Sequence, residues 1–299
     1  MKQIAPLCAP AEPDVQRSSC AVPAMACDCH AHIFGPPSQL VSSRLYTPPA
    51  ASLADYTHVL AVLGIERAVI VQPSVYSTNN RTTLQAVTEM GEASRAIVVV
   101  DPSISIPELE EMHQQGARGA RVNALFSGTS EQAALLALGL KLAEVGWHMQ
   151  MLIDVSIFDD LEGFVDALAV PVVFDHMGHV DTSRGLDDPG FTALLRLMER
   201  GKVWTKLSGS YRMTGQDHTP YTDVAPFARA LVAANPEQCV WASDWPHPQI
   251  PAAMPNDGAL LDMMMDWVPD TATRNRILKD NPARLYDFDD VTTQSGSST

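Results

Sequence analysis

The chain has 299 residues, of which 46% are hydrophobic and 18% are charged, a composition typical of a globular protein with a sizeable core. Its formal net charge of −15 argues against a nucleic-acid partner, because phosphate recognition needs clustered cations. No apolar run approaches the roughly 18 residues of a membrane span, so we expect no membrane partner either.

The two ends of the chain differ from the rest in composition. Residues 1–23 are rich in proline and lack a continuous apolar stretch, so we expect an irregular N-terminal arm and not a secretory signal. Residues 289–299 are mostly polar and predict a disordered C-terminal tail. Five cysteines, an odd number scattered along the chain, are not typical of a disulfide framework and favour a cytoplasmic protein.

Eight short apolar runs follow one another between these ends. They are rich in β-branched residues and are apolar on both faces, a pattern typical of buried parallel strands. The runs cover residues 24–30, 67–73, 95–101, 119–125, 148–154, 171–177, 203–209 and 239–245.

Most of the gaps between these runs carry helix signals. Ser52 and Asp55 are spaced as an N-cap pair, and Gly64 stands where that helix should end. Eight strand–helix units in about 250 residues predict an α/β fold, a (β/α)₈ TIM-type barrel in a single domain spanning residues 24–288. The alternative is a doubly wound open sheet, which would usually show a Gly-rich turn after its first strand, and "CDCHAHIFGPP" is not one.

Polar residues cluster at the ends of three runs. His30 and His32 end the first run, His176 ends the sixth and Asp244 ends the eighth. In a barrel these strand ends meet at one mouth, where the functional sites of such folds lie. The strand period of two predicts that His30 and His32 share one face, while Cys29 and Ala31 face the helices.

Three interpretations of this cluster stay open. Two or three imidazoles and a carboxylate can hold a single Zn²⁺, with His30, His32, His176 and Asp244 as ligands. Without a metal, Asp244 can take a proton from water while the imidazoles hydrogen-bond the oxyanion that forms on an ester carbonyl. The histidines can also simply fill the barrel. We favour the metal-free site, because the fourth and fifth runs end without a ligand that could bridge two metals, and we expect no cofactor, with one Zn²⁺ as the alternative.

Arginines near the same mouth point to an anionic substrate. Arg121 lies inside the run "GARVNAL", where a charge is costly unless it is paired, and Arg212 follows the seventh run. For Arg121 the alternative is an internal salt bridge to a barrel carboxylate. Loop residues that could donate hydrogen bonds, each equally well explained as surface, are Tyr46, Ser74, Tyr76 and Asn80. His148 heads the fifth run, at the opposite barrel end, and is expected to be structural.

As a set, these motifs resemble the lactonase branch of the amidohydrolase superfamily over roughly residues 25–288. The segments that carry the resemblance are "DCHAHIFGP" (28–36), "GARGARVN" (116–123), "VVFDHMG" (172–178), "VWTKLSGSYR" (203–212), "ASDWPHP" (242–248) and "DNPARLYDF" (280–288). The resemblance implies a TIM-type barrel that hydrolyses a lactone formed in the bacterial breakdown of aromatic compounds, similar to a pyrone dicarboxylate or a sulfomuconolactone.

The resemblance also implies roles for single residues. Asp244 matches the aspartate that activates water, and His30, His32 and His176 match the histidines that polarise the carbonyl. Members of the branch work with or without zinc, so the resemblance leaves the metal open. A second arginine after Arg121 and a tyrosine in the fifth strand have no counterpart here, which favours a lactone with one fewer anionic group, or a sulfonate. The matched substrate contacts are Arg121, Arg212, Tyr46, Ser74 and His247.

Two other functions stay open from the sequence. One is a metal-dependent decarboxylase of the same superfamily, and the other is a non-catalytic barrel that binds a carboxylate. The expected partner is a small anionic lactone, and assembly into a homo-oligomer stays open.

Overall fold

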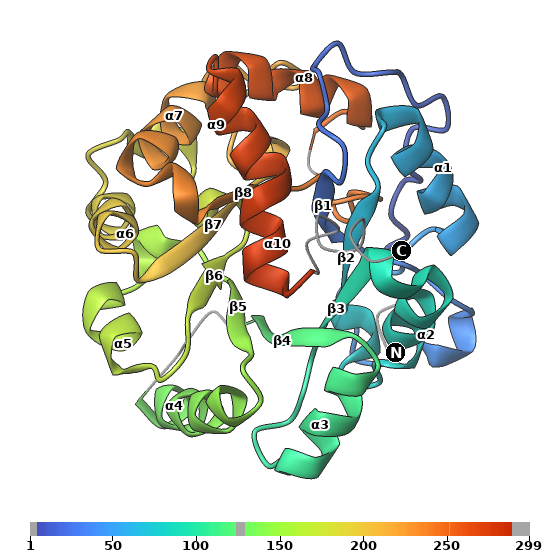
Figure 1. Ribbon diagram of the computed structural model, residues 1–299, viewed down its shortest axis with the longest axis vertical. Helices are drawn as coiled ribbons and strands as arrows, with labels where there is room; N and C mark the ends of the chain where they lie inside the picture. Colours follow the sequence, from blue (N-terminus) through green and yellow to red (C-terminus); the bar gives the residue numbers. More distant parts are fainter. Residues whose placement is uncertain (1–4, 124–128, 251, 289–299) are drawn as a thin grey trace, which may run out of the picture.

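The computed structural model describes residues 5–123, 129–250 and 252–288. Eight parallel strands pair in chain order, from β1 beside β2 to β7 beside β8, and ring the centre of the molecule in Figure 1. Each lies within or overlaps a predicted run. The strands are β1 (Cys27–Ala31), β2 (Arg67–Val71), β3 (Ser94–Val98), β4 (Ala117–Asn123), β5 (His148–Leu152), β6 (Val172–Phe174), β7 (Val203–Leu207) and β8 (Cys239–Trp241).

The first strand and the segment after the last one join along a seam that nearly closes the barrel. The backbone amide of Asp244 donates to the carbonyl of His30 at 2.9 Å. The backbone amide of His32 donates to the carbonyl of Trp245 at 2.8 Å. Beside them, the buried carboxylate of Asp28 accepts from the Ser243 amide at 2.9 Å and from the Ser243 hydroxyl at 2.5 Å. The predicted TIM-type barrel is confirmed, and the open doubly wound sheet is wrong.

Most helices alternate with the strands and surround the barrel, whereas the last helix lies across the centre of the ring of strands in the view of Figure 1. The first of them begins and ends where its sequence signals predict: Ser52 and Asp55 form a reciprocal capping box, and Gly64 ends the helix at φ 73°. The helices are α1 (Leu53–Leu63), α2 (Arg81–Met90), α3 (Ile106–Gln114), α4 (Thr129–Glu144), α5 (Leu161–Ala167), α6 (Pro189–Glu199), α7 (Ala225–Ala234), α8 (Asp257–Trp267), α9 (Thr271–Asn275) and α10 (Asn281–Tyr286).

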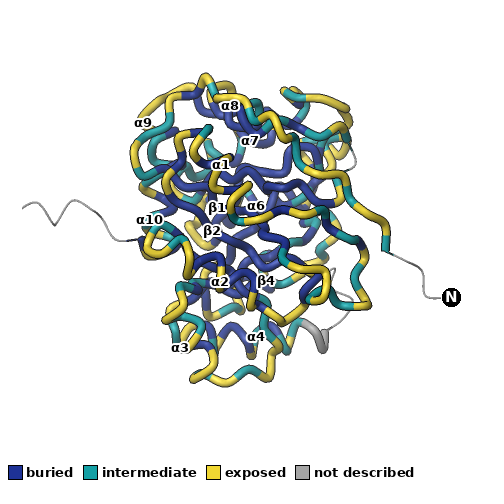
Figure 2. Tube along the Cα trace, turned by 90° about the vertical axis from the view of Figure 1, so that its right-hand side faces the viewer, coloured by how far each residue is buried: buried dark blue, intermediate teal, exposed yellow. Residues whose placement is uncertain are grey.

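Buried apolar side chains form two clusters. The larger one lies between strands and helices, and Figure 2 shows the buried strands within a more exposed outer layer. The smaller cluster comes from the other face of the strands and is joined by Tyr286 and Phe288, at the end of α10 and just after it. Because no described side chain of α1–α8 belongs to it, we assign the smaller cluster to the barrel interior.

One predicted side-chain direction is wrong. Ala31 packs with the helix-facing cluster as expected, but Cys29 belongs to the interior cluster. The cause is a bulge in β1: the four residues from Asp28 to Ala31 pair against the three from Ala68 to Ile70, which interrupts the strict alternation of sides. Burial raises the pKa of the Cys29 thiol well above its usual range, so it stays protonated and is no nucleophile.

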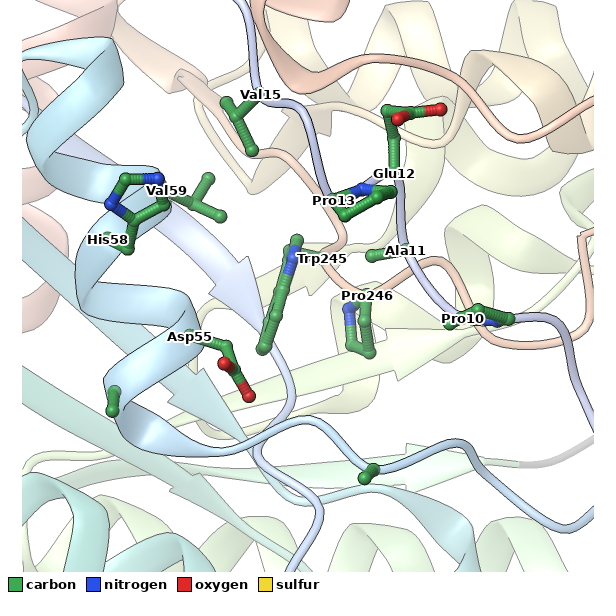
Figure 3. Close-up of a pocket in the computed structure, with 12 residues that line it drawn as sticks. Pro10, Ala11, Glu12, Pro13, Val15, Asp55, His58, Val59, Trp245 and Pro246 are labelled. Carbon is green, nitrogen blue, oxygen red and sulfur yellow. The ribbon is translucent and has the colours of Figure 1, made fainter.

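Among residues 5–23, the N-terminal arm forms no helix and only an isolated bridge between Leu7 and Thr47. It is tied to α8, because the Gln16 amide donates to Asn256 Oδ1 at 2.9 Å and the Ser19 amide to Asp262 Oδ1 at 2.6 Å. Figure 3 shows a pocket enclosed by this arm, α1 and the Trp245–Pro246 segment. The predicted disordered tail, residues 289–299, lies outside the described residues. No helix in the described part of the chain is long and apolar enough to cross a membrane.

Candidate active site

Asp244 lies at the centre of the residues predicted to form the site, three residues after the end of β8 and at a positive φ of 66°. Its Oδ2 accepts hydrogen bonds from the Tyr211 hydroxyl at 2.7 Å and from the Arg212 Nε at 2.9 Å. Its Oδ1 is buried and has no hydrogen-bond partner among the described residues. Burial alone raises the pKa of Asp244, but Arg212 and the surrounding histidines hold it well below its usual range. Asp244 is therefore a carboxylate with one oxygen held and one free.

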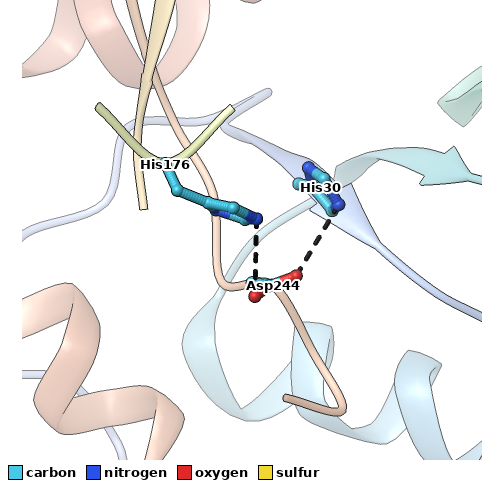
Figure 4. Close-up of side chains that lie close together, drawn as sticks. All are labelled: His30, His176 and Asp244. Atoms are coloured by element: carbon cyan, nitrogen blue, oxygen red, sulfur yellow. Dashed lines mark ion pairs between the residues drawn. The ribbon is translucent and has the colours of Figure 1, made fainter. Parts of the chain in front are cut away.

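The three predicted histidines surround this carboxylate, and Figure 4 shows His30 and His176 on either side of it. Their Nε2 atoms lie 3.6 Å (His30), 3.7 Å (His32) and 3.7 Å (His176) from an oxygen of Asp244. His30 and His32 also face each other, with their Nε2 atoms 3.3 Å apart, so the prediction that they share one face is confirmed. Four residues from three segments far apart in sequence thus meet at the carboxyl ends of β1, β6 and β8.

The protonation of these rings follows from their second nitrogens. His32 Nδ1 lies 2.7 Å from the carbonyl oxygen of Val71, which can only accept, so Nδ1 donates and Nε2 carries a lone pair. His176 Nδ1 lies 3.0 Å from the Ser208 hydroxyl, which can donate or accept. Burial lowers the pKa of His32 to about 4 and that of His176 to about 3. Both rings are therefore neutral at pH 7.

Beneath His30 lies a buried charged layer, of which only Arg121 was predicted from the sequence. The Asp175 carboxylate accepts a hydrogen bond from the side-chain Nε2 of Gln150 at 3.1 Å and pairs with Arg121 Nε at 3.2 Å. Lys206 places its Nζ 3.4 Å from the same carboxylate. Burial alone raises the pKa of Asp175, but Lys206, His30 and Arg121 hold it well below its usual range. The sequence signal was a charge inside an apolar run, as in "VWTKLSG", which is costly unless the charge is paired.

The predicted substrate-contact residues lie close to the site but are engaged to different degrees. Arg121 forms the internal salt bridge to Asp175 that was its alternative interpretation, and only 6% of the residue is exposed. Arg212 pairs with Asp244, and its side chain is 15% exposed. Tyr46 is buried and hydrogen-bonded to Ser74, which is exposed; burial raises the pKa of Tyr46 to about 12.

His247 and two loop residues make contacts within the protein. His247 lies behind Tyr211, with Nδ1 2.9 Å from the tyrosine hydroxyl and Nε2 3.2 Å from Asp257. The Asn80 side chain donates to the carbonyl of Val99 and accepts from its amide, so it ties a loop to the end of β3. Tyr76 accepts from the Gly35 amide at 2.8 Å. Tyr211, which holds Asp244, was not singled out from the sequence.

The donor set fits a single zinc ion. The candidate ligand atoms of His30, His176 and Asp244 all lie within 4.8 Å of one another, and His32 Nε2 lies close by. Imidazole nitrogens and a carboxylate are donors that zinc prefers, and the free Oδ1 of Asp244 is an unprotonated one. Lys206 and Arg212 place positive charges beside the same donor atoms, and their repulsion disfavours the binding of a dication.

Comparison with known proteins identifies the class. The family model described as amidohydrolase matches residues 27–288, and the chain belongs to this family. It is 33% identical to the 4-sulfomuconolactone hydrolase of Hydrogenophaga intermedia, over 95% of this chain and 96% of that one. It is 35% identical to a 2-pyrone-4,6-dicarboxylate hydrolase of Comamonas testosteroni, over 89% and 91%. The resemblance seen in the motifs is confirmed.

Two further comparisons widen the set of relatives. The chain is 32% identical to a D-galactarolactone isomerase of Agrobacterium fabrum, over 91% of this chain and 94% of that one. An apo crystal structure from Agrobacterium tumefaciens superimposes with a TM-score of 0.83 at 31% identity, covering 92% of this chain and all of the other. The curated relatives named here all act on lactones, according to their names.

Proposed function

We propose that this protein is a hydrolase that opens a small anionic, conjugated lactone in the catabolism of aromatic compounds. The observation that carries the proposal is the asymmetry of Asp244, whose Oδ2 is held by Tyr211 and Arg212 while Oδ1 lies free among three imidazoles. A fixed carboxylate with one free oxygen is suited to take a proton from water. The relatives that act on lactones support the choice of substrate class.

In the proposed reaction, Asp244 Oδ1 accepts a proton from a water molecule as the water oxygen bonds to the lactone carbonyl carbon. An imidazole N–H stabilises the negative charge that develops on the carbonyl oxygen. The ring C–O bond then breaks, and the proton held by Asp244 passes to the departing ring oxygen. Because His32 Nε2 carries a lone pair, we assign the donor role to His30 and His176, and His32 accepts a hydrogen bond instead.

We assign recognition of the substrate anion to Arg212, which is the more exposed of the two arginines, with Arg121 beside it. Tyr46 and Ser74 supply further polar contacts in this proposal, and His247 acts through Tyr211.

The proposed reaction needs no metal. With neutral histidines, three cations (Lys206, Arg121 and Arg212) face two carboxylates (Asp175 and Asp244), so the site already carries a net charge of about +1. This charge can stabilise an oxyanion without further help. A zinc ion held by His30, His176 and Asp244 would polarise the carbonyl and acidify the attacking water.

The test follows the ultraviolet absorbance of conjugated lactones as they open, including the pyrone dicarboxylate and sulfomuconolactone. Asp244→Asn keeps the shape of the side chain and removes the base, so we expect kcat to fall roughly 10²- to 10⁴-fold. Chelator-treated wild type should keep its activity. Asp266→Asn, at an exposed aspartate on α8, is the matched control and should leave kcat unchanged.

Other outcomes would assign a different function. Lactone binding without turnover would identify a non-catalytic barrel. Carbon dioxide release that a chelator abolishes would identify a decarboxylase. Conversion of one lactone into another, visible by NMR, would identify an isomerase like the Agrobacterium relative.

A further inference from the structure

Lys206 lies at the centre of the barrel, directly beneath the proposed active site, and the mechanism above uses only its positive charge. It is on β7, fully buried, and its Nζ contacts three groups. These are Gln150 Oε1 at 2.7 Å, His30 Nδ1 at 3.2 Å and Asp175 Oδ1 at 3.4 Å. An ammonium group has three protons to donate, and here it meets three atoms able to accept.

The orientation of Gln150 fixes the polarity of this layer. Asp175 is a carboxylate and can only accept, so the amide nitrogen of Gln150 faces it, at 3.1 Å. The amide oxygen of Gln150 therefore faces Lys206 and must accept from it. Lys206 is thus held as a donor on one side, with its remaining protons directed toward His30 and Asp175.

His30 has two candidate tautomers, and its surroundings distinguish them. Its Nε2 faces the lone pair of His32 Nε2 at 3.3 Å and the free Oδ1 of Asp244 at 3.6 Å. If His30 Nε2 carried no proton, three hydrogen-bond acceptors would face one another in a buried space, which is unfavourable. A proton on Nε2 lets His30 donate to His32 Nε2 and directs an N–H, not a lone pair, toward the Asp244 carboxylate. His30 Nδ1 must then accept, and the donor within reach is Lys206.

We propose that Lys206 is a positioning residue that fixes His30 with its proton on Nε2, so that His30 presents an N–H to the lactone carbonyl. This role rests on the proposed function. A doubly protonated His30 is disfavoured, because it would direct an N–H at the Lys206 ammonium only 3.2 Å away.

The same lysine opposes the zinc-binding form of the site. Coordination through His30 Nε2 needs the proton on Nδ1, where it would donate to Asp175 at 3.2 Å. Asp175 therefore supports the metal-binding tautomer and Lys206 the metal-free one. Removing Lys206 should allow His30 to carry a proton on Nδ1, donated to Asp175, and should strengthen zinc binding.

The test reads the tautomer directly. In chelator-treated wild type carrying ¹⁵N-labelled histidine, long-range ¹H–¹⁵N spectra should show His30 protonated at Nε2 only, with its signals assigned by their absence in His30→Gln. In Lys206→Met they should show a proton on Nδ1, where Asp175 can accept it. Asp175→Asn should keep it on Nε2. Lys202→Met, at an exposed lysine that pairs with Asp166, is the control and should match wild type.

Two further readouts accompany the spectra. Competition with a chromophoric chelator should show Zn²⁺ binding to Lys206→Met roughly 10- to 100-fold tighter than to wild type. With the lactone that wild type opens, kcat of Lys206→Met should fall about 100-fold with little change in KM. Asp175 keeps its pairing with Arg121 in this variant, so the fold is expected to survive.

Measurements on wild type alone can overturn the inference. The inference fails if the metal-free wild type carries the His30 proton on Nδ1, or if the purified wild-type protein retains tightly bound zinc. It also fails if Lys206→Met leaves both the tautomer and the zinc affinity unchanged. A protein with the expected tautomers that opens none of the lactones would refute the proposed function instead, so the two failures are distinguishable.

Discussion

The two oxygens of Asp244 have different surroundings, and the chemistry of the site depends on that difference. Tyr211 and Arg212 fix Oδ2, and Arg212 keeps the carboxylate ionised, while Oδ1 has no partner among the described residues. His247 contributes indirectly, because it contacts the Tyr211 hydroxyl and pairs with Asp257. Asp244 and His247 both have positive φ, so the short segment between them turns sharply back toward the barrel.

At the scale of single residues, this arrangement predicts an unusual pH profile. Burial lowers the pKa of His32 to about 4 and that of His176 to about 3, so both stay neutral well below pH 6.5. We expect kcat/KM to be flat from about pH 8 down to about pH 5 and to fall near pH 4, where His32 gains a proton and its Nε2 stops accepting.

The measurement is kcat/KM across this range, with circular dichroism at each pH to show that the protein remains folded. An acidic limb centred between pH 6 and 7 would contradict the prediction of a flat profile.

At the scale of elements, the loop after β7 supports His176 from behind. Gly209 lies at φ 62°, and a Cβ built there would lie 2.6 Å from the His176 ring. Gly209→Ala should therefore displace the ring from Asp244 and lower kcat roughly tenfold or more, since small misplacements are costly in catalysis. It should also lose about 1 kcal/mol of unfolding free energy, because the left-handed backbone is strained for alanine.

Gly64→Ala is the matched control for this prediction. Gly64 ends α1 at φ 73°, and no atom lies within 4 Å of the point that a Cβ would occupy, so the same backbone strain arises without a clash. Urea unfolding should show similar destabilisation of both variants, and kinetics should show a loss of kcat in Gly209→Ala alone. Equal activity of the two variants would refute the supporting role of Gly209.

The elements were predictable from sequence because each strand is an apolar run and each boundary carries a local signal, such as the Ser52 capping box and the Gly64 terminus. His30, His32, His176 and Asp244 were predictable because polar residues stood at strand ends. Two kinds of feature were not. The bulge in β1 turns Cys29 inward through its pairing with β2, a non-local cause. Asp175 lies next to a buried strand and Lys206 within one. The pairing of these two charges depends on how the strands are arranged in the barrel, which the local sequence does not show.

At the scale of the whole molecule, the barrel holds several buried histidines neutral, and this links stability to pH. His148 is an example remote from Asp244: it begins β5, is buried against Tyr286, and burial lowers its pKa to about 3. In the unfolded chain its pKa is about 6.5. The unfolded state therefore binds more protons below pH 6.5, and the protein loses stability as the pH falls from there toward 3.

We expect His148 alone to remove about 2 kcal/mol of unfolding free energy between pH 8 and pH 5. His148→Leu should abolish that contribution, so its unfolding free energy should change less with pH than that of wild type. Urea denaturation at pH 8, 6.5 and 5 measures the difference. His58→Leu, at an exposed position on α1, should keep the wild-type slope. A His148→Leu slope equal to that of wild type would contradict the assignment.

The seam between β1 and the segment after β8 has a consequence for how the protein folds while it is synthesised on the ribosome. Asp28 and Ser243, which bond across it, are 215 residues apart in the chain. At ordinary rates of synthesis, roughly 10 to 40 s separate the emergence of the two. Throughout that interval His30 and His32 exist without Asp244, and the open edge of β1 is available for unwanted pairing. The active site therefore assembles only after nearly the whole chain has emerged, and premature termination before residue 244 yields no partial activity.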